Sequence, residues 1–227
     1  MILCLVVEAI VILTLVVIIG WNKGVGDWME SLQRPVVRKL EMSGINSPYA
    51  VLMQVKGGKI IGNMKGDEKI YPASMTKILT VLVAAEHVTD LDDTFTITKE
   101  ITDFSYSHDC SAVGFLDEET VTVRDLLYGT ILPSGGDAAA GLACYVAGSM
   151  DAFVDMMNEK LVELGCQESH FENPSGLNGD NQYVSAYDMA LIAQAAYDNE
   201  TMVEISSATT HKIAPTTQNP DGFTIRG

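Results

Sequence analysis

At residues 71–80 the chain reads YPASMTKILT, and this stretch decides how the rest is interpreted. Ser74 and Lys77 stand three positions apart, and Pro72 just before them is typical of the start of a helix. The following residues, Ile78 to Val83, are almost entirely apolar and predict a buried helix. Side chains at positions i and i+3 share one helix face, so the sequence places a hydroxyl beside an amine.

The chemistry of this pair depends on the charge of Lys77. Burial lowers the pKa of a lysine, and a neutral amine can accept the proton of Ser74 and activate it as a nucleophile. A Ser-x-x-Lys pattern alone is weak evidence, because about one such match is expected by chance in a chain of this length. A helix N-cap beside a solvated lysine is the simpler interpretation, but the apolar helix and the hairpin-like segment before it favour a reactive serine.

A second stretch, LPSGGDAAAG at residues 132–141, leads from small, turn-forming residues into an alanine-rich helix. One interpretation is an ordinary connection between helices, with Ser134 or Asp137 as the N-cap. The other is functional, because small residues allow close approach and Ser134 would bring a second hydroxyl beside Ser74.

Together the two stretches resemble the serine-type D-alanyl-D-alanine carboxypeptidases, the low-molecular-weight penicillin-binding proteins of peptidase family S11. The signature of that family is Ser-x-x-Lys, then Ser-x-Asn, then Lys-Thr-Gly. An opening hairpin, the helix before the second motif and the segment after it are also similar. In this chain these regions are residues 49–63, 121–127, 173–177 and 183–188, and the resemblance covers about residues 47–225.

Two departures from the family pattern concern the site. Gly136 stands where the family usually carries the asparagine of Ser-x-Asn, so only its backbone is expected to bind substrate there. An asparagine introduced at this position is expected to fit. The sequence also contains no Lys-Thr-Gly, and residues 216–226 resemble the lead-in to the strands that carry it. We therefore expect a chain that is truncated before the third motif and is weakly active or inactive as it stands.

The resemblance implies acyl transfer on peptidoglycan stem pentapeptides, with release of the terminal D-Ala. It makes Ser74 the acyl-ester nucleophile, Lys77 the general base and Ser134 the proton relay to the leaving amine. β-Lactam antibiotics would acylate the same serine. Two alternatives stay open: a serine β-lactamase, with Glu172 as the candidate added base, and a non-catalytic penicillin-binding-like wall protein.

Composition restricts the remaining classes of function. The 227 residues carry 14 basic and 30 acidic side chains, and the formal charge of −16 argues against nucleic acid as a partner. The hydrophobic content of 47% is enough for a sizeable core. The scattered histidines and the four cysteines (Cys4, Cys110, Cys144 and Cys166) lack metal-ligand spacing, so we predict no metal and no cofactor, while a disulfide stays open.

Residues 1–20 form an apolar run, interrupted only by Glu8 and Thr14, that is long enough to cross a bilayer. We predict a transmembrane anchor; a cleaved signal peptide is the alternative, although a basic n-region and a cleavage site are missing. Residues 21–46 then form a juxtamembrane linker and residues 47–227 an incomplete catalytic domain. The positive charges after the run favour a cytoplasmic domain. The resemblance instead places it at the extracytoplasmic face of a bacterial cell membrane, or makes it secreted, and we follow the resemblance.

Periodicity and turn residues predict strands at 49–55, 59–63 and 94–97, and helices at 74–88, 122–132, 136–147, 149–164 and 186–199. Ser149 and Ser185 are the expected N-caps, and Gly165 the expected C-cap. Early strands, a helical block and strands expected to return at the end indicate an α+β domain with helices flanking an antiparallel sheet. This agrees with the β-lactamase/transpeptidase-like fold that the resemblance implies.

Overall fold

The computed structural model describes residues 42, 44–108 and 110–227, which belong to one compact unit, Lys39–Gly227. The predicted membrane segment, residues 1–20, and most of the predicted linker lie outside the described residues. Among the residues that are described, no helix is both long enough and apolar enough to cross a bilayer.

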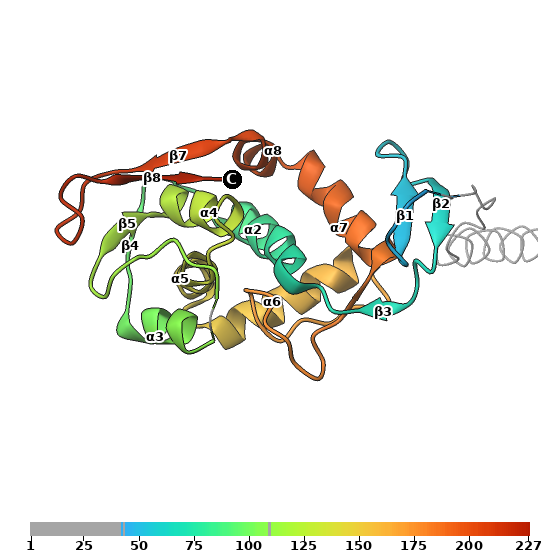
Figure 1. Cartoon of the computed structure of the whole chain (residues 1–227), viewed down its shortest axis with the longest axis horizontal. Helices are drawn as coiled ribbons and strands as arrows, with labels where there is room; N and C mark the ends of the chain where they lie inside the picture. The colour runs from blue at the N-terminus through green and yellow to red at the C-terminus, as the bar shows by residue number, and fades with distance from the viewer. Residues whose placement is uncertain (1–41, 43, 109) are drawn as a thin grey trace, which may run out of the picture. The chain divides into compact units, whose positions relative to one another are not determined.

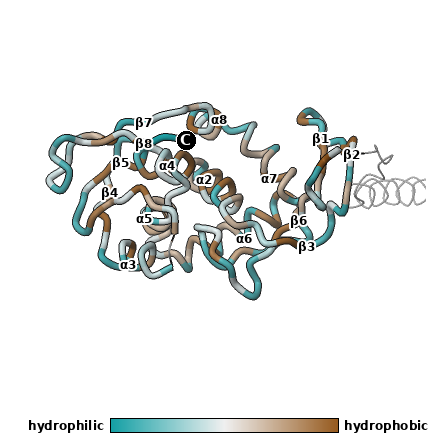
Figure 2. The backbone as a smooth tube through the Cα atoms, viewed as in Figure 1, coloured by the Kyte–Doolittle hydropathy of each residue, from teal (hydrophilic) through white to brown (hydrophobic). Residues whose placement is uncertain are grey.

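The core is built around α2 (Thr76–His87), which packs against the surrounding helices (Figure 1). Eight of its residues are buried, including Leu79, Val81 and Leu82, as its apolar sequence predicted. The helices around it are α4 (Val123–Ile131), α5 (Gly136–Ala147), α6 (Met150–Glu163), α7 (Ala186–Asp198) and α8 (Glu200–Ser207). Figure 2 shows hydrophobic residues along α2 and hydrophilic residues in the connection between β7 (Thr210–Ile213) and β8 (Phe223–Arg226).

All five predicted helices are present, with ends within two residues of the predicted ones. Ser149 and Ser185 cap α6 and α7 through their side chains, and Gly165 after α6 has φ +75°. Two helices were missed. α3 (Lys99–Ser107) is only nine residues long and buries two of them, and α8 is separated from α7 only by its own N-cap, Asn199.

The strands pair antiparallel, as predicted, but the expectation of a single sheet is wrong for the described residues. They form four two-stranded ladders, each bordered by helices or loops. The pairs are β1 (Ala50–Met53) with β2 (Ile60–Met64), β3 (Lys69–Ile70) with β6 (Val184–Ser185), β4 (Thr94–Thr96) with β5 (Thr120–Thr122), and β7 with β8. The predicted strands at 49–55, 59–63 and 94–97 correspond to β1, β2 and β4. The ladders are only two to four residue pairs long, and the other strands gave no separate signal in the sequence.

Two buried hydrogen bonds fix the segment before β6 against the first turns of α2. The Thr80 hydroxyl donates to the carbonyl of Pro174 over 2.7 Å, and the Gln182 side-chain amide donates to the Thr76 hydroxyl over 3.1 Å. Buried polar groups require such partners, so these bonds hold the segment in one position. That position brings residues 173–177 next to Lys77.

Candidate active site

Ser74 lies in η1 (Ala73–Met75), the 3₁₀ turn that leads into α2, and Lys77 is the second residue of α2. The Lys77 Nζ donates a hydrogen bond to the Ser74 Oγ over 3.4 Å, so the two side chains meet as their spacing predicted. Ala73, just before the serine, has φ +46°, the left-handed region that non-glycine residues rarely adopt. Such strained backbone is common at functional sites.

Lys77 is almost completely enclosed, with 5% of its surface exposed. Its Nζ also donates to the carbonyl oxygen of Ser175 over 2.5 Å. Burial lowers the pKa of Lys77 below its ordinary value of 10.5, while the thiolate form of Cys110 and the Asp137 carboxylate partly oppose this shift. The environment therefore moves Lys77 toward the neutral amine that a general base requires.

The Ser175 carbonyl is held in place by a tight turn over residues 173–177. The side-chain oxygen of Asn173 accepts hydrogen bonds from the backbone N–H groups of residues 175, 176 and 177. Gly176 has φ +90°, and a Cβ there would collide with the carbonyl of Ala73. The turn therefore packs directly against the backbone that leads into Ser74.

Ser134 lies in the connection between α4 and α5 and has φ +59°. In the described part of the chain, no hydrogen bond joins its hydroxyl to Ser74, Lys77 or any other group. The N-cap of α5 is Gly135, without a side-chain cap, so neither Ser134 nor Asp137 caps this helix. A substrate can therefore meet the Ser134 hydroxyl without breaking an existing bond.

Gly136 is the first residue of α5, and its surroundings differ from those that the sequence suggested. Its N–H donates to the carbonyl of Ser111 over 2.7 Å, so this donor already has a partner. A Cβ at position 136 would lie 2.8 Å from the Cβ and 3.1 Å from the sulfur of Cys110. The expectation that an asparagine fits here is therefore wrong unless Cys110 moves. Nothing in the sequence relates positions 110 and 136.

Asp137 organises the loop beside the site, a role that sequence reasoning missed. Its carboxylate, 2% exposed, accepts hydrogen bonds from the backbone N–H groups of Val113, Gly114 and Phe115 over 2.9, 2.9 and 3.2 Å. The sequence shows that an aspartate stands in an alanine-rich helix, where a buried carboxylate is unusual. It does not show which loop residues donate to that carboxylate.

The remaining candidate residues make other contacts. Glu172 is exposed, and its carboxylate accepts from the Asn181 side-chain amide over 3.2 Å rather than bonding to Ser74. His211 bonds to Asp125 over 2.6 Å. Among the described residues, no disulfide joins the cysteines and no group of side chains could hold a metal ion.

Residues 36–224 match peptidase family S11, whose description is D-alanyl-D-alanine carboxypeptidase. The chain belongs to this family. The S11 chain is 34% identical over 157 residues to the D-alanyl-D-alanine carboxypeptidase DacF of Bacillus subtilis. That alignment covers 69% of this chain and 40% of the relative, so the chain spans well under half the length of this curated relative.

Two solved structures resemble the S11 chain in fold. The DD-transpeptidase of Streptomyces K15 gives a TM-score of 0.75 at 27% identity, covering 83% of this chain and 76% of that one. Penicillin binding protein 5 of Haemophilus influenzae gives 0.73 at 30% identity, covering 82% and 54%. These likenesses confirm the mixed α and β penicillin-binding fold that the resemblance implied.

Proposed function

We propose that this chain carries the acyl-transfer site of a serine D,D-carboxypeptidase that removes the terminal D-Ala from peptidoglycan stem pentapeptides. The observation that carries the proposal is the buried Lys77, whose Nζ lies 3.4 Å from the Ser74 Oγ and whose pKa is lowered by burial. Membership of peptidase family S11 and the carboxypeptidase relative support this reaction class.

In the proposed reaction the Ser74 Oγ attacks the carbonyl between the two terminal D-alanines while Lys77 takes the hydroxyl proton. Ser134 passes a proton to the leaving D-Ala amine, and water then hydrolyses the acyl ester. The Ser74 N–H is the proposed oxyanion donor from this chain. The sequence also suggested the Gly136 backbone as a substrate contact, but its N–H already donates to Ser111, so we do not assign that donor to the substrate. β-Lactams would form the same ester and remain attached.

The proposed location follows from the proposed substrate. Peptidoglycan lies outside the bacterial cell membrane, so we place the domain at the extracytoplasmic face. The apolar run of residues 1–20 supports a membrane attachment there, or secretion if the run is cleaved.

A β-lactamase is less well supported, because it needs an additional base that activates the deacylating water. Glu172 was the candidate, but it is exposed and bonded to Asn181. A non-catalytic wall-binding protein would not need a buried lysine beside a serine, and burying such a group without a function is costly.

A fluorescent penicillin tests the proposal on the full chain. We expect stable labelling of Ser74, located by mass spectrometry of a digest, together with release of D-Ala from a D-Ala-D-Ala peptide. Ser74→Ala should abolish labelling, whereas Ser206→Ala, an exposed serine on α8, should not. Rapid loss of the label would indicate a β-lactamase. No labelling would indicate a binding protein, and a label on Ser134 or on a cysteine would contradict the assignment of the nucleophile.

A further inference from the structure

Two successive carbonyl groups of the turn at residues 173–177 accept hydrogen bonds from α2. The Pro174 carbonyl accepts from the Thr80 hydroxyl over 2.7 Å, and the Ser175 carbonyl accepts from the Lys77 Nζ over 2.5 Å. Both bonds are buried. A carbonyl is a fixed acceptor only if the peptide that carries it cannot rotate, so the conformation of the turn determines where the partner of Lys77 lies.

One side chain fixes the backbone of this turn. The Asn173 Oδ1 accepts from the N–H groups of Ser175, Gly176 and Leu177 over 3.2, 2.8 and 3.0 Å, and from the Ser175 hydroxyl over 3.1 Å. The Asn173 amide nitrogen donates to the Leu177 carbonyl over 2.9 Å. Pro174 follows directly and restricts both its own φ and the backbone of Asn173.

The peptide unit between Ser175 and Gly176 connects Asn173 to Lys77. This peptide is trans, so it is planar and its N–H and C=O groups point in opposite directions. In this unit the Gly176 N–H donates to Asn173, and the Ser175 carbonyl accepts from Lys77. The hydrogen bond that holds the N–H end therefore also sets the direction of the carbonyl.

That direction matters for a general base. A neutral lysine amine has two N–H bonds and one lone pair, and it rotates freely unless a partner holds it. Only the lone pair can accept the Ser74 proton. Because the Ser175 carbonyl holds one N–H of Lys77, it limits this rotation while the Ser74 Oγ lies 3.4 Å from the Nζ.

We propose that Asn173 is a positioning residue for the general base, and that it acts through the peptide between Ser175 and Gly176 to orient the Lys77 amine toward Ser74. This inference rests on the proposed function, since Lys77 acts as a base only in that reaction.

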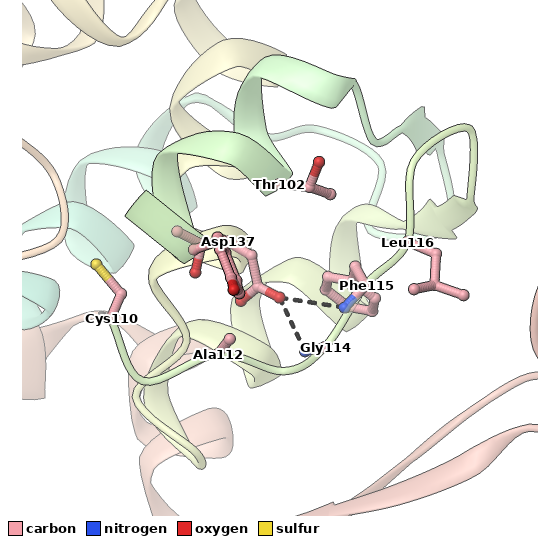
Figure 3. A pocket seen from close by; sticks show the side chains of 9 residues that line it. Thr102, Cys110, Ala112, Gly114, Phe115, Leu116 and Asp137 are labelled. Carbon is pink, nitrogen blue, oxygen red and sulfur yellow. Dashed lines mark hydrogen bonds between the residues drawn. The ribbon is translucent and has the colours of Figure 1, made fainter. Parts of the chain in front are cut away.

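The charged groups that act on Lys77 come from other elements. Cys110 lies on the loop between α3 and β5, and Asp137 lies on α5, where its carboxylate bonds to the backbone of that loop (Figure 3). Substitutions at Asn173 leave both groups in the chain. The Ser175 carbonyl favours the ammonium form of Lys77, because it accepts a hydrogen bond from it.

The test measures the second-order rate constant for acylation of the full chain by a fluorescent penicillin as a function of pH, below the Tm of every variant. The rate rises with pH as Lys77 becomes neutral, up to a plateau. Asn173→Ala removes the acceptor and should lower the plateau about tenfold or more, because the amine loses its orientation. The same variant should move the rising limb of the pH profile to lower pH, because a displaced carbonyl no longer favours the ammonium.

Asn173→Asp should have the opposite effect on the limb. Its carboxylate can accept from the same three backbone N–H groups, so the plateau should stay within a few-fold of wild type. Its charge favours the ammonium form of Lys77, so the rising limb should move to higher pH. A general loss of stability cannot move the limb in opposite directions in the two variants.

Asn199→Ala is the matched control. Asn199 caps α8 by accepting from the Met202 N–H over 3.0 Å, so this variant should lower the Tm but change neither the plateau nor the limb. If Asn173→Ala does not fold, Asn173→Ser replaces it with the same expectations, because the shorter hydroxyl reaches fewer of the N–H groups.

A rising limb that stays fixed or moves to higher pH when the acceptor is removed would make Asn173 a purely structural residue and overturn the proposal. An unchanged plateau would do the same. Either result, with Ser74 still acylated, would leave the proposed function intact. Failure of the penicillin to acylate Ser74 in the wild type would overturn both.

Discussion

In the proposed reaction Lys77 accepts the proton of Ser74 only as a neutral amine, so the charge of this one side chain controls the proposed chemistry. Burial opposes the ammonium form, whereas Cys110 and Asp137 favour it. The result is a lysine whose pKa is lowered, which leaves it a base that can both accept and return a proton.

Lys77→Arg should be nearly as damaging as Lys77→Ala, because a guanidinium stays protonated at any accessible pH and is too large for this enclosed position. We expect acylation by a fluorescent penicillin to slow by about 100-fold or more in both variants, the usual contribution of a general base. An arginine variant that acylates within a few-fold of wild type would mean that Lys77 acts only as a nearby charge.

The pH dependence of acylation should follow Lys77. Because the neutral amine is the active form, the rate should rise with pH through the pKa of Lys77, below the ordinary value of 10.5. In its thiolate form Cys110 raises this pKa, so Cys110→Ser should move the rising limb of the pH profile to lower pH. Cys144→Ser is the matched control and should leave the limb in place. A limb that stays fixed or moves upward in Cys110→Ser would contradict this account.

Gly136→Asn should be destabilising by itself, because its Cβ would press on Cys110. We expect a loss of about 1–3 kcal/mol, typical of overpacking, seen as a lower Tm. Adding Cys110→Gly should restore most of that loss, since it removes the obstructing side chain. If the double variant is no more stable than Gly136→Asn, another feature must require glycine at this position.

At the scale of elements, the turn of residues 173–177 holds the proposed nucleophile in position from outside α2. It packs on the backbone before Ser74 through Gly176 and presents a carbonyl to Lys77. The sequence identified this turn only through its family resemblance, because nothing local indicates that it meets a helix about a hundred residues earlier. The helices themselves were predictable, since apolar spacing and capping serines are local signals.

Gly176→Ala should displace Ser74 as well as strain the turn. We expect a loss of about 3 kcal/mol or more, together with strongly reduced penicillin acylation. Gly148→Ala provides the comparison: its φ is +82°, but no atom lies within 4 Å of an added Cβ. That control should cost only about 1–2 kcal/mol and leave acylation unchanged. Equal effects in the two variants would show that backbone strain alone is responsible.

At the scale of the whole molecule, a buried carboxylate ties the hairpin of β7 and β8 to the middle of the chain. Glu119 is 0% exposed and accepts from the Thr216 hydroxyl, the Asn219 amide and the Leu116 N–H over 2.6, 2.8 and 2.9 Å. In the sequence Glu119 stands in an acidic run with Asp117 and Glu118, and nothing local sets it apart, because its two side-chain donors lie about a hundred residues later.

Glu119→Gln should weaken this connection, because its amide nitrogen would face a donor instead of accepting from it. We expect a loss of about 1–3 kcal/mol in the free energy of unfolding, measured with urea. Glu118→Gln, at the exposed neighbouring position, should change it by less than about 0.5 kcal/mol. Equal stability of the two variants would mean that Glu119 is not a structural connection.

The contact between Lys77 and the Ser175 carbonyl has a consequence for mutational mapping of the site. Every amino acid supplies the same peptide oxygen, so an alanine scan replaces the Ser175 side chain and leaves this acceptor in place. The scan would report only the loss of the Ser175 hydroxyl, which donates to the Asn173 side-chain oxygen over 3.1 Å, and not the peptide oxygen that orients the amine toward Ser74. The conformation of the loop determines where this oxygen lies. Its role is therefore tested by substitutions that change the loop, at Asn173 or Gly176.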